Sequence, residues 1–259
     1  MTLGYRELLD FHIAALQGHF IDEIVPAPHD AGVMIFSRRE TEAMWNLLFV
    51  ANAAAAEAHR ATITQAFAVR ERRPTWYLPD ASGAALSPDW FASGQNSWMV
   101  RPRGTAAHEL PADLTLLPVK TPAQIRLFNR LYIDVYWESA PPPDVALPID
   151  AEEPLSTSDG EFNVRHWLLY RARSPVAMLT TFMRAGLCGL YNVGTDPQFT
   201  GRGYASHAIL AVLAQLEAEG CQTSFLLTEC NPRLAPFYGR LGFSTIVTGQ
   251  FFVCSEKKG

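Results

Sequence analysis

The chain has 259 residues, of which 48% are hydrophobic, 11% aromatic and 18% charged, and its formal net charge is −5. This length and apolar content are enough for a sizeable core and for one or two globular domains. The acidic balance, without a basic half, argues against nucleic acid or an anionic membrane as the partner.

The four cysteines all lie in the C-terminal part of the chain: Cys188, Cys221, Cys230 and Cys254. No two of them have C-x-x-C spacing, so we expect reduced thiols and no metal centre. The N-terminal segment carries Glu7 and Asp10 where a signal peptide would be apolar, and the longest nearly apolar run, 47–56, is too short to span a bilayer. These features predict a cytoplasmic protein.

The first 112 residues have the pattern of a smaller α/β domain. Apolar spacing and Gly or Pro punctuation predict these elements in chain order: a helix at 3–21, strands at 32–36 and 45–50, a helix at 51–72, and strands at 75–78 and 97–100. The second strand, second helix and third strand have the order of a right-handed βαβ unit. This half contains no catalytic motif, and its histidines have no metal-ligand spacing.

A change of composition at 101–113, with two prolines, a glycine and several charges, marks the predicted domain boundary. We therefore expect domains at 1–112 and 113–259. The second domain should contain, in order, a strand at 114–120, a helix starting at Thr121, a long loop at 138–160, strands at 164–171, 176–184 and 187–193, a helix at 204–219, a strand at 223–229, a helix at 232–241 and one or two strands within 244–254.

The stretch LCGLYNVGTDPQFTGRGYA, residues 187–205, joins a strand to a helix through a glycine-rich turn. Glycines let backbone N–H groups approach a phosphate, and the helix N-terminus adds unpaired donors and the positive end of its dipole. The arrangement predicts an anion-binding loop, although a plain tight turn before a helix would use the same glycines.

A second motif, NPRLAPFYGRLGF at 231–243, follows the next strand. Asn231 as N-cap and Pro232 at the first helical position predict a helix, and Gly242 ends it. Tyr238 shares the apolar face of this helix with Leu234. Without any ligand, Asn231 would still be a helix cap and Tyr238 a packed core side chain.

Together, TDPQFTGRGYASHAIL and the later N-x-x-x-x-x-F-Y-x-x-x-G-F pattern resemble the GNAT superfamily of acyl-CoA-dependent N-acyltransferases. The resemblance covers residues 113–254 and includes the order of the elements. It implies an α/β (α+β) fold with a mixed central sheet of GNAT type, in which two parallel strands splay apart, and acetyl-CoA or another acyl-CoA as co-substrate. The order of elements in the first 112 residues suggests a second, degenerate copy of this fold.

The resemblance also implies roles for individual residues. The family pattern Q/R-x-x-G-x-G/A falls on residues 200–205, but a threonine replaces the usual Gln or Arg at its first position. The segment whose backbone would hold the CoA pyrophosphate consists of Thr200, Gly201, Arg202, Gly203, Tyr204, Ala205 and Ser206. Backbone groups of Val193 and Thr195 would bind the acyl carbonyl and the pantetheine, and Asn231 would contact the pantetheine arm.

The chemistry implied by the resemblance needs a proton donor, an oxyanion donor and a proton acceptor. Tyr238 would protonate the departing thiolate, and the Val193 N–H would stabilise the oxyanion. Histone-type members have a glutamate four residues before the Val193 position, where this chain has Gly189, so a protein-lysine substrate loses support. The remaining candidates are Glu229 as the catalytic base, and Glu138 and Tyr191 as substrate-binding residues.

Two functions stay open. One is an N-acyltransferase that moves an acetyl or other acyl group from acyl-CoA to a primary amine of a small molecule by direct attack in a ternary complex, with a peptide N-terminus as a further acceptor. The alternative is a non-catalytic acyl-CoA-binding module or sensor, which Thr200 and Gly189 favour. No nucleic-acid or membrane partner is expected, and the edge of the short C-terminal strands would allow a homodimer.

Overall fold

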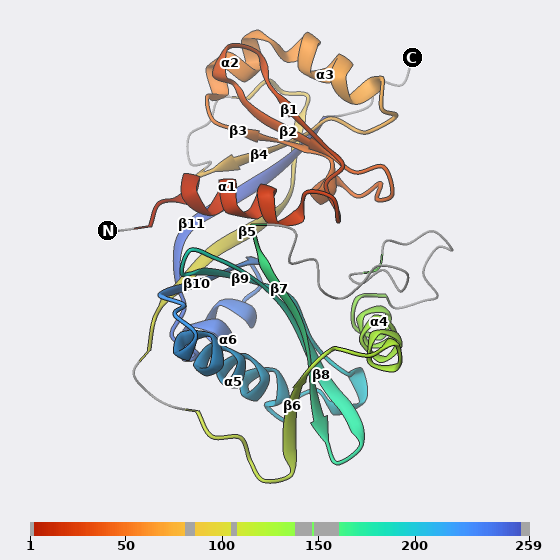
Figure 1. The fold of residues 1–259 in the computed structure, drawn as a ribbon. Coiled ribbons are helices and arrows are strands. Elements are labelled where there is room, and N and C mark those ends of the chain that lie inside the picture. Colours follow the sequence, from red (N-terminus) through yellow and green to blue (C-terminus); the bar gives the residue numbers. More distant parts are fainter. Residues whose placement is uncertain (1–2, 81–85, 105–107, 138–146, 148–160, 255–259) are drawn as a thin grey trace. The chain divides into compact units, whose positions relative to one another are not determined.

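The computed structural model describes residues 3–80, 86–104, 108–137, 147 and 161–254. The chain divides into two compact units, each of which contains helices and strands (Figure 1). Unit 1 comprises residues 1–98, 228–235 and 245–259, and unit 2 comprises residues 99–227 and 236–244.

Unit 1 begins with a helix followed by short strands. Its first elements are α1 (Tyr5–Leu16), β1 (Glu23–Pro26), η1 (Pro28–Asp30), β2 (Gly32–Phe36), η2 (Ala43–Trp45), β3 (Leu47–Val50), α2 (Ala53–Ala58), α3 (Arg60–Ala68) and β4 (Thr75–Pro79). β1, β2 and β3 are antiparallel neighbours, and β4 lies parallel to β3. The predicted strand–helix–strand order is therefore confirmed as a parallel pair of strands joined by helices.

The predicted helix at 51–72 forms two helices rather than one. α2 and α3 meet at His59, whose φ of −107° and ψ of 18° leave the helical range. The ring of His59 stacks on His29, with centroids 4.1 Å apart. The alanine-rich composition favours a helix throughout this segment. It gives no indication that His59 contacts His29, which lies far away in the sequence.

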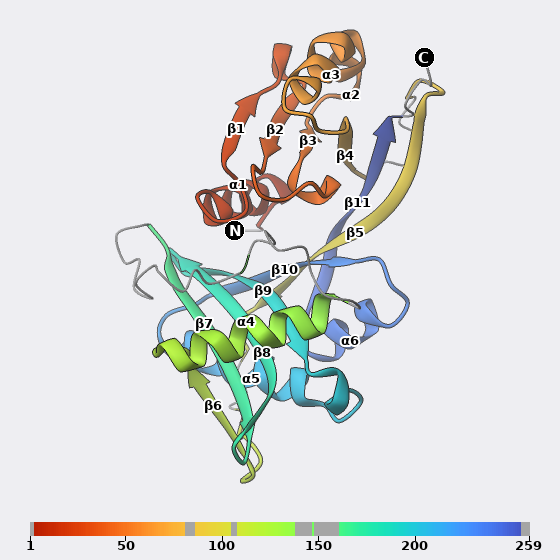
Figure 2. The same cartoon turned by 90° about the vertical axis from the view of Figure 1, so that its right-hand side faces the viewer.

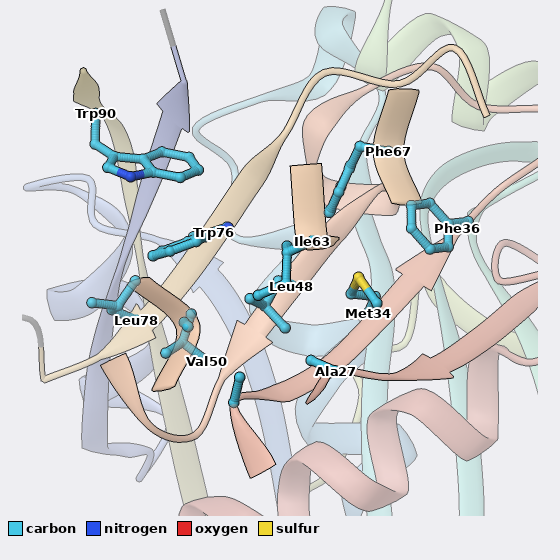
Figure 3. Packing of buried hydrophobic residues seen from close by; sticks show 12 residues of the cluster. Ala27, Met34, Phe36, Leu48, Val50, Ile63, Phe67, Trp76, Leu78 and Trp90 are labelled. Carbon is cyan, nitrogen blue, oxygen red and sulfur yellow. The ribbon is translucent and has the colours of Figure 1, made fainter. Parts of the chain in front are cut away.

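The core of unit 1 lies between its central strands and the α2–α3 pair (Figure 3). Phe67 of α3 meets Phe36 of β2 edge-on with ring centroids 5.0 Å apart. Trp76 of β4 lies 4.2 Å from Trp90 by the same measure. Figure 1 shows α1 on the opposite side of these strands, so the strands are buried on both faces and their sequences are almost wholly apolar.

Unit 2 has the element order predicted for residues 114–219. It contains β6 (Leu114–Pro118), α4 (Pro122–Tyr136), β7 (Asn163–Arg171), β8 (Ser174–Arg184), β9 (Leu187–Thr195), η3 (Pro197–Phe199) and α5 (Tyr204–Ala218). β6 to β9 form an antiparallel meander, and α4 and α5 cover its opposite faces (Figures 1 and 2). The start of α4 agrees with the helix predicted from Thr121, since Thr121 is its N-cap and Thr121 Oγ1 accepts a hydrogen bond from the N–H of Gln124 at 3.3 Å.

Four elements fall at the borders between the two units. β5 (Trp90–Pro102), β10 (Thr223–Glu229) and α6 (Leu234–Arg240) each contribute residues to both, and β11 (Ser244–Cys254) lies almost wholly in unit 1, where it pairs with β4. Each compact unit is thus made of separate segments of the chain. The predicted domains at 1–112 and 113–259 would each be one continuous segment.

Candidate acyl-CoA site

The glycine-rich turn ends at the first residue of α5. Gly201 and Gly203 have φ values of 76° and 78°, a left-handed backbone that glycine adopts without strain. Gly203 is the N-cap of α5, and no side chain caps this helix. Because first-turn N–H groups have no partner inside a helix, the N–H groups of 204–206 are available to an external anion.

The turn before these glycines is braced by its own side chains. The Asp196 carboxylate accepts a hydrogen bond from the N–H of Gln198 at 2.8 Å, and the Thr200 hydroxyl donates to the carbonyl of Pro197 at 3.3 Å. The Arg202 guanidinium lies over the ring of Phe199, 5.5 Å from its centroid. Thr200 therefore stabilises the loop from within, at the position where the family pattern has a Gln or Arg.

β9 separates from its parallel neighbour just before this turn. Its pairing with β10 runs only from Leu187 opposite Thr223 to Gly189 opposite Phe225. The antiparallel pairing with β8 is also interrupted, because Asn192 has a left-handed φ of 51° and forms a bulge with Val193. The strand thus bends away at the segment that carries Val193 and Thr195, and the predicted splay of two parallel strands is present.

The backbone of this bulge is held by a residue that the sequence pattern does not single out. Tyr136, the last residue of α4, donates its hydroxyl to the carbonyl oxygen of Val193 at 3.1 Å. Burial, together with the neighbouring phenols of Tyr238 and Tyr132, raises the pKa of Tyr136 above its ordinary value. Aromatic spacing on α4 shows that this residue shares a face with Tyr132, but not which backbone group it reaches.

Tyr238 of α6 is the predicted proton donor. Its side chain is 8% exposed, and burial raises its pKa to about 12, so the phenol carries its proton at neutral pH. Its ring lies edge-on to Phe237 and Phe243. The structure thus brings Tyr238 close to Tyr136, whose hydroxyl bonds Val193, within unit 2.

Gly189 marks the position of the absent glutamate. A Cβ placed there would lie 2.6 Å from Cε2 of Tyr191 and 3.0 Å from Cζ of Phe225. The rings of these two residues lie edge-on with centroids 6.4 Å apart, and burial raises the pKa of Tyr191 well above its ordinary value. Two aromatic rings therefore fill the space that a longer side chain at residue 189 would need.

Glu229 and Asn231 are assigned to unit 1, whereas the glycine loop belongs to unit 2. Glu229 is exposed, and the Asn231 side-chain oxygen accepts a hydrogen bond from the N–H of Arg233 at 2.9 Å. α6 begins at Leu234 rather than at the predicted residue 232, because residues 231–234 form a separate turn. Glu138 lies outside the described residues.

Three polar side chains behind the bulge are linked by hydrogen bonds around the buried Thr180, and the sequence pattern contains no signal for this arrangement. The Asn192 amide donates to the hydroxyl of Thr180 at 3.2 Å, and Thr180 Oγ1 lies 2.8 Å from Nδ1 of His166. The three side chains come from β9, β8 and β7 and connect the bulge with the interior of the sheet. In the described part of the chain, no three His, Cys, Asp or Glu side chains gather into a metal site.

In unit 1, the connection between β3 and α2 occupies the equivalent place between a strand and a helix, but it has no glycine loop. The connection there is short, and the Asn52 side chain accepts the N–H of Ala55 at 3.1 Å, which caps α2 from within the protein. An anion would have to compete with this cap. At this connection, unit 1 therefore lacks the helix start without a side-chain cap that unit 2 has at α5.

A family model described as the acetyltransferase (GNAT) family matches residues 130–243, the segment that contains the splay, the glycine loop and Tyr238. No curated protein matches the sequence. None of the described helices combines the length and apolar character needed to cross a bilayer.

Solved structures with related folds extend over most of the chain. A GCN5-related N-acetyltransferase from Kribbella flavida is 18% identical, with a TM-score of 0.70 over 98% of this chain and 97% of that one. One from Sphaerobacter thermophilus is 14% identical, with a TM-score of 0.61 over 86% and 80%. A tandem GNAT protein from the clavulanic acid biosynthesis pathway is 12% identical, with a TM-score of 0.51 over 87% and 75%. The mixed α/β GNAT fold is thus established.

Proposed function

We propose that this GNAT protein transfers an acyl group, acetyl in the simplest case, from acyl-CoA to a primary amine of a small molecule. The observation that carries the proposal is that the start of α5, which has no side-chain cap, follows the strand that separates from β10, with only the glycine-rich turn between β9 and α5. The start of α5 offers N–H donors to a diphosphate. The separation of β9 from β10 leaves backbone groups of β9 free to bind the extended pantetheine arm of CoA.

The residues of the loop fit the pyrophosphate of CoA. Cβ atoms placed on Gly201 and Gly203 would meet no other atom within 4 Å, so the space beside both glycines is open. The backbone N–H groups of 201–206 would hold the diphosphate, and the backbone of Val193 and Thr195 would hold the acyl carbonyl and the pantetheine. Asn231 is proposed as a contact of the pantetheine arm, and Tyr191 as a wall of the acceptor pocket.

The transfer requires a neutral amine nitrogen to form a bond to the acyl carbon while the bond from that carbon to sulfur breaks. The Val193 N–H would stabilise the oxyanion. Tyr238 would give its proton to the leaving sulfur, and the nitrogen would lose one proton to Glu229 or to water, so the proton balance closes. The raised pKa of Tyr238 keeps the donor in its acid form at neutral pH.

Binding is tested first, by the melting temperature of the full chain with added acetyl-CoA. A ligand at 100 times its dissociation constant adds about 2.7 kcal/mol of stability. Absence of any shift at millimolar acetyl-CoA would rule out both the enzyme and a non-catalytic acyl-CoA sensor.

Catalysis is tested by release of free thiol from acetyl-CoA across a panel of primary amines, which includes small-molecule amines and peptide N-termini. Turnover by the wild type and its loss in Tyr238→Phe support the proposed reaction. Binding without turnover of any amine would favour the sensor, an alternative that Thr200 and the aromatic filling around Gly189 support.

A further inference from the structure

The bond from Tyr136 to Val193 joins a helix end to a strand bulge 57 residues away, at the segment proposed for the pantetheine arm. Tyr136 is 49% exposed as a whole residue, so the end of α4 that makes this bond lies at the protein surface. A Cβ on Gly194 would lie 2.8 Å from Val135, which shows how closely the end of α4 approaches β9.

The Val193 carbonyl is placed outside the regular ladder. In the pairing of β8 with β9, Thr180 faces Tyr191 and Met178 faces Gly194, so Asn192 and Val193 share a single opposite residue. The parallel pairing with β10 has already ended at Gly189. A carbonyl in this position is open to a donor other than a neighbouring strand, and the Tyr136 hydroxyl is such a donor.

We propose that Tyr136 is a positioning residue whose hydroxyl occupies the Val193 carbonyl until the pantetheine arm of CoA replaces it with one of its own N–H donors. This inference rests on the proposed function. The Val193 carbonyl thus accepts a hydrogen bond from Tyr136 in the free protein and from the pantetheine arm in the complex. Because Tyr136 ends α4, binding of the arm would also affect the last turn of this helix.

The proton state of Tyr136 agrees with this role. Although much of the ring is exposed, burial around the phenol oxygen and the phenols of Tyr238 and Tyr132 raise its pKa, so Tyr136 remains a hydroxyl donor throughout the neutral range. A phenolate could not donate to a carbonyl. The bond is therefore present in the free protein at any pH at which the amine reaction would be measured.

The exchange predicts a gain of affinity when the hydroxyl is removed. Tyr136→Phe should bind CoA about two- to tenfold more tightly than the wild type, because the arm no longer has to displace a protein hydrogen bond that contributes about 0.5–1.5 kcal/mol. The nucleotide half of CoA, adenosine 3′-phosphate 5′-diphosphate, lacks the arm and should bind both proteins equally. Tyr132→Phe, which removes a phenol hydroxyl one turn earlier on the same helix, should leave both affinities within twofold.

Isothermal titration of the full-length proteins with CoA and with the nucleotide half measures these affinities, and a melting curve checks that each variant folds. Since a carbonyl has two lone pairs, it could accept Tyr136 and the arm together. In that case Tyr136→Phe would bind CoA equally or more weakly, and the inference would be overturned. If the wild type binds neither compound, the proposed function itself fails, which is a different outcome.

Discussion

Gly189 and Tyr191 compete for one space on β9, since a Cβ on Gly189 would come within 2.6 Å of the Tyr191 ring. The Phe225 ring closes the same space at 3.0 Å. The GNAT resemblance places a glutamate here in histone-type members, and that side chain has no room in this protein. In the proposed reaction, the proton of the amine would therefore pass to another residue or to water. The rings of Tyr191 and Phe225, which fill this space, are a candidate surface for the amine substrate.

Gly189→Ala should reduce the free energy of unfolding by about 1–3 kcal/mol, the usual cost of an extra methyl group in a packed core. The matched control is Gly239→Ala in α6, where a Cβ would meet no atom within 4 Å. This control should leave stability unchanged or slightly higher, because alanine favours helix over glycine. Chemical denaturation measures both, and equal stability of the two variants would contradict the crowding argument.

Gly203→Ala should weaken CoA binding about tenfold as well as reduce stability by about 1 kcal/mol. A Cβ on a left-handed residue strains the backbone that presents the first N–H groups of α5. Gly220→Ala is the control, since Gly220 also has a left-handed φ, of 106°, and open space around it, but follows the other end of α5. It should show the same loss of stability with unchanged affinity for CoA. Loss of affinity in both variants would mean that the effect comes from strain alone.

The pH profile of acyl transfer should rise as the amine loses its proton and then stay level to about pH 11. Tyr238, with a pKa raised by burial to about 12, keeps its acidic proton over this range. Tyr238→Phe should follow the same profile about a hundredfold lower, the usual contribution of a general acid. A basic limb near pH 10 that is present in the wild type and absent from Tyr238→Phe would show that Tyr238 titrates normally.

Unit 1 should lose stability as the pH falls from about 6.5 to about 4. Burial lowers the pKa of His12 from 6.5 to about 4, so the unfolded chain takes up the proton first and is favoured by acid. The effect amounts to about 3 kcal/mol once the pH is below both pKa values. His12→Gln should be less stable at neutral pH and lose less stability on acidification. Parallel stability curves for the two proteins, measured by urea unfolding at each pH, would contradict this origin.

The sequence was most informative where structure depends on neighbouring residues. The helix predicted at 204–219 is α5, and the strand predicted at 223–229 is β10, because glycine punctuation and apolar runs are local signals. The same local signals mark the anion-binding loop. Only residues 97–100 of β5 are predicted as a strand, because the first part of this 13-residue strand includes Gly94 and several polar side chains and carries no local signal.

In the candidate site, too, some features have a local sequence signal and others depend on contacts between distant residues. The glycines and Tyr238 stand in recognisable motifs, so their positions could be predicted. The bond between Tyr136 and Val193 and the polar chain through Thr180 depend on packing between separate elements. The roles of the motif residues in binding and catalysis stay predictions until the experiments described above are done.

The pairing of β11 with β4 has a consequence for biosynthesis. Residues 249–253 form the antiparallel neighbour of residues 75–79, although the two segments lie far apart in the sequence. Unit 1 therefore cannot complete this pair of strands until β11 has been synthesised. We expect a nascent chain stalled before residue 249 to remain sensitive to protease in its first hundred residues.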